Sequence, residues 1–229
     1  LMRKSRTEGF DELAAMVADY TPERVAEICG IDARDLEAAA EMYATAERAP
    51  IVYCLGVVEH STGTEGVMAL SNLALAAGKH VIITKPLMVS LDQAQELLDA
   101  QRAAGKYVMV GQSSRYYETT MRQRRDYEAG KHGDLITVEA QYISDSRWFL
   151  QRAWSHQKGF SWQYNFLIHA LDLAVWYLPK TEEVYAAGVV SQNSLEYDIH
   201  CPDSIKVLLR DPEGHTASVT GCYASPTFR

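Results

Sequence analysis

The chain has 229 residues, of which 47% are hydrophobic and 23% charged, the proportions of an ordinary globular protein. Its formal net charge of −8 argues against nucleic acid or an anionic membrane as a partner, because both favour a basic surface. The four cysteines include no C-x-x-C pair, which excludes a zinc ribbon or an iron–sulfur motif within this chain. Because no stretch has the length of a membrane span and no apolar signal core follows the charged start, we expect a cytoplasmic protein.

Residues 8–46 have the pattern of a helical segment. Thr21 is suited to cap a helix, Pro22 to its first position, and Gly30 to its end. The preceding stretch places four apolar side chains on one helical stripe: Phe10, Leu13, Met16 and Val17. No strand pattern precedes Ile51, so we predict a helical segment over residues 1–47.

The next part of the chain, residues 48–115, alternates short apolar runs with helical patterns. We expect strands at 51–57, 80–84 and 106–111, separated by helices at 65–77 and 90–105. Ser90 is the expected N-cap of the second helix, and Gly105 the residue that ends it. A β-α-β-α-β order with short connections predicts a partial Rossmann-like parallel sheet, and therefore an α/β fold class.

Residues 116–229 are predicted to form an α+β domain with a mostly antiparallel sheet. After a helix that ends at Gly130, residues 135–145 alternate apolar and polar side chains as a half-covered strand does. The aromatic-rich stretch 146–164 is expected to be a loop over a pocket. A buried helix is expected at 165–179, followed by three strands at 183–192, 203–211 and 216–224. We expect this domain to be truncated at the C-terminus, which leaves an unpaired sheet edge.

Lys85 and Pro86 stand where the strand at 80–84 ends. Proline has no N–H to donate, so the strand must stop there and Lys85 is left at the carboxyl end of a parallel strand. Ligands bind at this edge of open α/β sheets, and a lysine partly removed from water there has a lowered pKa. The alternative is a surface lysine before a proline turn.

Four motifs in order carry a family resemblance: AGKHVIITKPL at 77–87, VGQSSRYY at 110–117, GDLITVEAQYISD at 133–145 and FLIHALDLAVWYLP at 166–179. From about residue 75 to residue 229 the chain resembles the Gfo/Idh/MocA oxidoreductases. The resemblance implies a dehydrogenase that uses NAD or NADP and acts on a sugar, inositol or related polyol. We also expect a homo-oligomer formed through the C-terminal sheet.

The same resemblance assigns roles to particular residues. Lys85 is implied to lie near the nicotinamide ribose and the substrate hydroxyl, although Thr84 replaces the glutamate of the family motif. His169 is implied to be the general base, a role that suits a neutral imidazole. Asn165 stands where many members have aspartate, and it can orient a substrate hydroxyl but cannot take its proton.

Other candidate contacts follow from spacing or position. The H-x-x-D spacing puts His169 and Asp172 on one helix face, either as site residues or as a hydrogen-bonded core pair. Arg115 is expected to contact substrate or cofactor, or to form a salt bridge, and Trp154 to line a sugar-sized pocket or to fill the core. We assign no metal. A weak S-x-G-x-x-G pattern makes three further residues candidate phosphate contacts: Ser61, Gly63 and Gly66.

A second resemblance covers about residues 9–78, most closely in IVYCLGVVEHSTGTEGVMALSNLAL. This segment resembles an internal piece of the catalytic subunit of molybdopterin-dependent formate dehydrogenases. It stands where a Gfo/Idh/MocA protein has its glycine-rich nucleotide turn. Three interpretations follow: a dehydrogenase, a catalytically incomplete fusion with no intact nucleotide site, or a fragment of a formate dehydrogenase.

Overall fold

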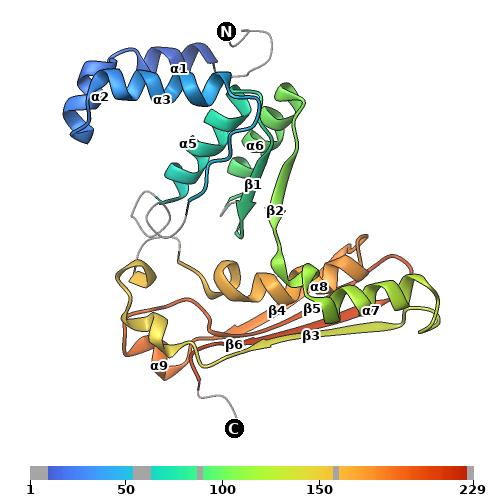
Figure 1. The fold of residues 1–229 in the computed structure, drawn as a ribbon. Helices are drawn as coiled ribbons and strands as arrows, with labels where there is room; N and C mark the ends of the chain where they lie inside the picture. The colour runs from blue at the N-terminus through green and yellow to red at the C-terminus, as the bar shows by residue number, and fades with distance from the viewer. Residues whose placement is uncertain (1–9, 54–62, 87–89, 157–159, 226–229) are drawn as a thin grey trace. The chain divides into compact units, whose positions relative to one another are not determined.

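The computed structural model describes residues 10–53, 63–86, 90–156 and 160–225 (Figure 1). The chain divides into two compact units, which we call the N-terminal unit, residues 1–83 and 90–109, and the sheet unit, residues 84–89 and 110–229. The fold is mixed α/β with one parallel and one mixed sheet, which confirms the predicted fold class. The domain limits predicted from the sequence stay a prediction.

The N-terminal unit contains three helices followed by a small α/β arrangement. Its two strands pair in a parallel sheet, with Val81 N donating to Tyr107 O at 2.8 Å and the His80 ring stacked on Tyr107. The elements are α1 Phe10–Val17, α2 Pro22–Cys29, α3 Ala33–Thr45, α5 Gly63–Ala76, β1 Val81–Thr84, α6 Leu91–Ala104 and β2 Val108–Gly111.

The helix limits that local chemistry predicted are confirmed. Thr21 Oγ1 accepts from Arg24 N, and Ser90 Oγ accepts from Gln93 N, so each side chain satisfies an amide of the first turn. Gly30 and Gly105 end α2 and α6 with φ of 69° and 61°, the left-handed region that glycine adopts most readily.

Two expectations for this unit have a different outcome. Residues 51–53 belong to no helix or strand, and the rest of the strand predicted at 51–57 lies outside the described residues. Met16 and Val17, predicted to lie on an apolar stripe, are exposed, and neither α2 nor α3 has a buried residue.

Within the described part of the chain, no helix combines the length and the apolar character needed to cross a membrane.

The sheet unit has four strands in the order β3-β6-β5-β4. The β3–β6 pair is parallel and the other two pairs are antiparallel, so the predicted mostly antiparallel sheet is confirmed. Its elements are η2 Ser113–Tyr116, α7 Glu118–Glu128, β3 Thr137–Ile143, η3 Arg147–Gln151, η4 Ala153–His156, η5 Gln163–Leu167, α8 Ile168–Tyr177, β4 Glu183–Val189, α9 Gln192–Leu195, β5 Ser204–Arg210 and β6 Thr216–Cys222.

The two faces of this sheet differ in what covers them. Helix α8 packs on β3 and β6 and covers the face that carries Val207 and Leu209. The opposite face, which we call the open face, carries Leu208 of β5, opposite Ser218 of β6 and Tyr185 of β4 in the register. Side chains along β5 are buried and exposed in turn, because successive residues of a strand point to opposite faces of the sheet.

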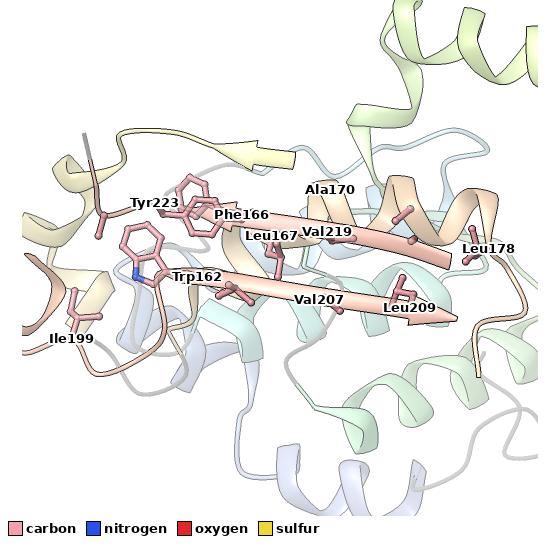
Figure 2. Packing of buried hydrophobic residues seen from close by; sticks show 14 of the residues in the cluster. Trp162, Phe166, Leu167, Ala170, Leu178, Ile199, Val207, Leu209, Val219 and Tyr223 are labelled. Carbon is pink, nitrogen blue, oxygen red and sulfur yellow. The ribbon is translucent and has the colours of Figure 1, made fainter. Parts of the chain in front are cut away.

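The core of the sheet unit lies between α8 and the sheet (Figure 2). At one end the rings of Trp162, Phe166 and Tyr223 pack together, with Trp162 stacked on Tyr223 at 5.6 Å between ring centroids. Leu178 and Leu209 lie toward the other end. Burial of these apolar side chains is what fixes α8 on the sheet.

The prediction of a loop over 146–164 was wrong for part of this stretch. Residues 147–151 and 153–156 form 3₁₀ turns, and Trp162 is fully buried in the core. The physical reason is the aromatic content that suggested a pocket wall: Trp162 packs edge-on against Phe160 and tilts against Phe166. Aromatic burial therefore orders the segment.

Leu167→Ala should destabilise the sheet unit by about 2–5 kcal/mol, because Leu167 is 2% exposed and its removal leaves a cavity between α8 and the sheet. Leu195→Ala is the matched control, since Leu195 is 42% exposed, and it should change stability by less than about 0.5 kcal/mol. Urea unfolding followed by circular dichroism measures both. Equal midpoints for the two variants would contradict the described core.

Candidate active site

Lys85 lies in the sheet unit, immediately after β1. Its Nζ donates to the backbone carbonyl of Asn165 and lies 5.8 Å from the centroid of the Phe166 ring. The side chain is half-buried, and this burial lowers the pKa of the ammonium from its ordinary value. The lysine therefore points toward the η5–α8 segment that carries His169.

His169 lies in the first turn of α8, half-buried, with the Tyr142 ring edge-on at 5.6 Å. Its Nδ1 is 3.1 Å from the hydroxyl of Ser114, a buried residue of η2. Burial lowers the pKa of His169, and the positive charge of Lys85 lowers it further, whereas the charge of Asp172 raises it. A lowered pKa leaves the imidazole neutral near neutral pH, as a general base requires.

Asp172 is occupied by Arg115 and does not bond to His169. Arg115 Nε and Nη2 each donate to one carboxylate oxygen at 2.6 Å, and the guanidinium lies 5.3 Å from the centroid of the Trp176 ring. Such a bidentate pair is both strong and geometrically specific. The alternative in which His169 and Asp172 bond to each other is therefore wrong, because Asp172 bonds to Arg115. The alternative in which Arg115 forms a salt bridge is confirmed.

Asn165 lies in η5, one turn before His169, and its side-chain amide donates to Ser161 O at 2.9 Å. The turn η5 has π geometry. Such turns are rare in proteins, but those that occur are often found at functional sites. Pro86 follows Lys85 through a cis peptide bond. The structure thus brings four predicted site residues near His169 in one unit: Lys85, Asn165, Arg115 and Asp172.

The remaining predicted contacts are not part of this cluster. Trp154 belongs to η4, and its side chain lies outside the description. Gly63 and Gly66 lie in the first turn of α5, in the N-terminal unit, and Ser61 is outside the described residues. Their roles in binding substrate or phosphate stay predictions.

Ser114 and Tyr142 both contact His169, and neither was among the predicted site residues. Both stand inside the quoted motifs VGQSSRYY and GDLITVEAQYISD, but nothing in their spacing predicts a partner on a distant helix. The one sequence feature that points to Ser114 is its position directly before Arg115. A salt bridge from Arg115 to the helix that carries His169 would also hold Ser114 close to that helix.

Two cavities of about 660 and 470 Å³ are found in the sheet unit, and neither is lined by Lys85 or His169. The larger is lined by Asp211, Glu213 and His215, whose ligand atoms lie within 4.8 Å of one another. The Asp211 carboxylate accepts from His215 N and pairs with its Nδ1, and Glu213 pairs with Lys180. These groups stabilise the turn between β5 and β6, and we assign them no metal.

Family models match both parts of the chain. A model described as oxidoreductase family, NAD-binding Rossmann fold matches residues 4–112, and one described as GFO/IDH/MocA C-terminal domain matches residues 120–229. With the parallel sheet and the lysine–imidazole pair, these matches define the class as NAD-binding oxidoreductases. The chain belongs to the Gfo/Idh/MocA family.

Solved structures show the same fold. An aldose–aldose oxidoreductase from Caulobacter crescentus is 21% identical, with a TM-score of 0.64 over 90% of this chain and 61% of that one. A myo-inositol dehydrogenase from Corynebacterium glutamicum is 19% identical, with a TM-score of 0.59 over 72% of this chain and 48% of that one. At these identities the likeness shows the fold alone.

Curated relatives match a different enzyme class. The chain is 45% identical over 75 residues to the F420-dependent formate dehydrogenase subunit alpha of Methanocaldococcus jannaschii, which is 33% of this chain and 11% of that protein. Formate dehydrogenase H of Escherichia coli is 45% identical over 74 residues, 10% of its length. The predicted resemblance of a segment to these subunits is confirmed, and the chain spans only a small part of them.

The family is described as NAD-binding, which confirms at family level the cofactor predicted by resemblance, NAD or NADP. In the sheet unit, a half-buried amine and an imidazole with a lowered pKa are groups that suit proton transfer beside such a cofactor. In the N-terminal unit, the predicted phosphate contacts are amides at the start of α5 around Gly63. The same turn also contains the carboxylate of Glu65, which disfavours an anion at that helix end.

Lys85→Met should raise the pKa of His169, because it removes a nearby positive charge while keeping the size of the side chain. Asp172→Asn should lower the same pKa, because it removes the negative charge that raises it. Titration of the imidazole signals by NMR measures both shifts. Lys180→Met, which removes an exposed lysine paired with Glu213, is the control and should leave the pKa of His169 unchanged. An unchanged pKa in Lys85→Met would contradict the proximity of the two groups.

Proposed function

We propose that this chain is an NAD(P)-dependent dehydrogenase that oxidises a hydroxyl group of a sugar, inositol or related polyol. The observation that carries the proposal is that the Lys85 ammonium bonds to the Asn165 carbonyl and acts through its charge on His169, inside one folded unit. Burial lowers the pKa of both side chains. Membership of the Gfo/Idh/MocA family supports the reaction class. The substrate class follows the predicted family resemblance, and the aldose–aldose oxidoreductase and myo-inositol dehydrogenase that share this fold suggest aldoses and myo-inositol as the first substrates to test.

The proposed chemistry divides between these two side chains. A bound NAD or NADP supplies the acceptor for the hydride that leaves the substrate carbon. His169 takes the hydroxyl proton through Nε2, and the substrate alcohol becomes a carbonyl. Lys85 donates a hydrogen bond to the substrate oxygen and stabilises the negative charge that develops on it. Asn165 is the candidate to orient a neighbouring hydroxyl.

Lys85→Met and His169→Asn should each lower turnover by about 10²-fold or more, because each removes a group that handles the transferred proton or its oxygen. Formation of reduced nicotinamide with myo-inositol or an aldose measures turnover, and calorimetric titration with NAD and NADP measures binding. Lys180→Met and His200→Asn are matched controls, because both residues are exposed and paired with carboxylates elsewhere. No heat at millimolar cofactor and no turnover by the unaltered chain would refute the proposal.

A catalytically incomplete fusion is the second candidate. It is favoured by a 75-residue segment that is 45% identical to a formate dehydrogenase subunit. The resemblance predicted over residues 9–78 falls where the nucleotide-binding model also matches. In that case the sheet unit folds and the nucleotide site does not form. A folded chain that binds neither NAD nor NADP would establish this alternative. A working formate dehydrogenase fragment is disfavoured, since the cysteines offer no C-x-x-C pair for a cluster.

We also propose that the chain forms a homo-oligomer through the open face of its sheet. This face exposes apolar side chains on three strands: Ile143 of β3, Tyr185 and Val189 of β4, and Leu208 of β5. Burial of such a patch against a second copy stabilises a dimer with matching faces. The alternating charges of Lys206 and Glu139 on the same face offer pairs across a two-fold axis.

Tyr185→Glu should dissociate the oligomer, because it places a carboxylate in the centre of an apolar contact. Val184→Glu is a close control: Val184 is 64% exposed and Tyr185 69%, but the two neighbours point to opposite faces of β4. Light scattering coupled to gel filtration measures the mass of each variant. Loss of the oligomer in Val184→Glu alone, or a monomeric unaltered chain, would contradict assembly through the open face.

A further inference from the structure

Ser114 and Arg115 are neighbours on η2, and each bonds to one of two residues a turn apart on α8. Ser114 Oγ lies 3.1 Å from His169 Nδ1, and Arg115 holds the Asp172 carboxylate through two contacts of 2.6 Å. The ion pair therefore fixes η2 beside α8 at the position that puts the Ser114 hydroxyl against the imidazole. Ser114 is 8% exposed, so few water molecules compete for this contact.

We propose that Ser114 is a positioning residue that selects the tautomer of His169, an inference that rests on the proposed dehydrogenase function. In the neutral imidazole, Nδ1–H donates to Ser114 Oγ and leaves the lone pair of Nε2 free to take a proton. The proton released from the substrate hydroxyl then passes to Nε2. The resulting imidazolium keeps its Nδ1–H on Ser114, so the hydroxyl accepts in both states and does not have to turn.

The choice of serine at this position has a chemical consequence. A carboxylate at Nδ1 would hold the ring equally well but would stabilise the imidazolium and raise its pKa. Here the carboxylate of Asp172 is bonded to Arg115, and the positive charge of Lys85 opposes protonation of the ring. The Tyr142 ring, which lies edge-on to the imidazole, carries a phenol that is neutral near neutral pH, and burial raises its pKa further. A neutral hydroxyl thus orients the base without raising its pKa.

The test is the protonation state of each ring nitrogen in the full chain labelled with ¹⁵N-histidine. Two-bond proton–nitrogen correlation spectra report it directly, and His169→Asn identifies the signals of His169. We expect the neutral ring of the unaltered chain to carry its proton on Nδ1. Ser114→Ala should move that proton partly or wholly to Nε2, while Ser114→Thr, which keeps the hydroxyl, should restore the Nδ1–H form.

Ser113→Ala is the matched control, because Ser113 is the exposed neighbour in the same turn and should leave the tautomer unchanged. A neutral His169 protonated on Nε2 in the unaltered chain, or a tautomer that Ser114→Ala does not change, would overturn the proposal. This readout needs no turnover. It therefore separates failure of this inference from failure of the proposed function.

Kinetics give a second readout where the chain turns over substrate. Ser114→Ala should lower kcat by about 10- to 100-fold with little change in KM, because the substrate still binds but meets fewer imidazoles with a free Nε2. Ser114→Thr should recover most of kcat. A kcat unchanged in Ser114→Ala, or a loss not restored by the threonine variant and matched by a loss of folded protein, would count against a positioning role.

Discussion

The bidentate contact between Arg115 and Asp172 is the interaction on which the rest of the candidate site depends. It joins η2 to α8 with two charge-assisted hydrogen bonds of 2.6 Å, and the guanidinium also lies over the Trp176 ring. Because the carboxylate is used in this way, it acts on His169 only through its electric field. The imidazole then has a hydroxyl as its hydrogen-bond partner, and burial together with Lys85 keeps its pKa low. The ion pair therefore helps to fix the position of the neighbouring ring, whereas burial and the charge of Lys85 set its basicity.

Lys85 completes this arrangement from a different part of the chain. Although it directly follows β1, residues 84–89 belong to the sheet unit, and its ammonium bonds to the carbonyl of Asn165 one turn before His169. The spatial relation of amine and imidazole is thus set inside one folded unit. The predicted phosphate contacts at Gly63 and Gly66 lie in the other unit. The ammonium and the imidazole can therefore keep their mutual geometry independently of the residues around α5.

Local chemistry predicted the features of this protein that depend on neighbouring residues. Thr21 and Ser90 cap their helices, Gly30 and Gly105 end them, and the alternation predicted for residues 135–145 is present in β3. The three-residue spacing of His169 and Asp172 also placed them correctly on one helix. Their partners could not be predicted in this way, because Ser114 and Arg115 lie 55 and 57 residues earlier and the contacts exist only once η2 packs on α8. The burial of Trp162 and the parallel pairing of β3 with β6 are tertiary in the same sense.

The two similarities in this chain are compatible because they concern different levels of structure. A short α/β unit requires apolar strands, capped helices and left-handed glycines, and enzymes with unrelated chemistry meet these requirements with similar patterns. A segment like that of a formate dehydrogenase can therefore stand where a nucleotide-binding model also matches. The proposed chemistry depends instead on a few residues at the ends of elements: Lys85 after β1, Ser114 and Arg115 on η2, and His169 at the start of α8. Since these four residues lie outside the helices and strands that the first segment supplies, the identity of that segment does not determine their geometry.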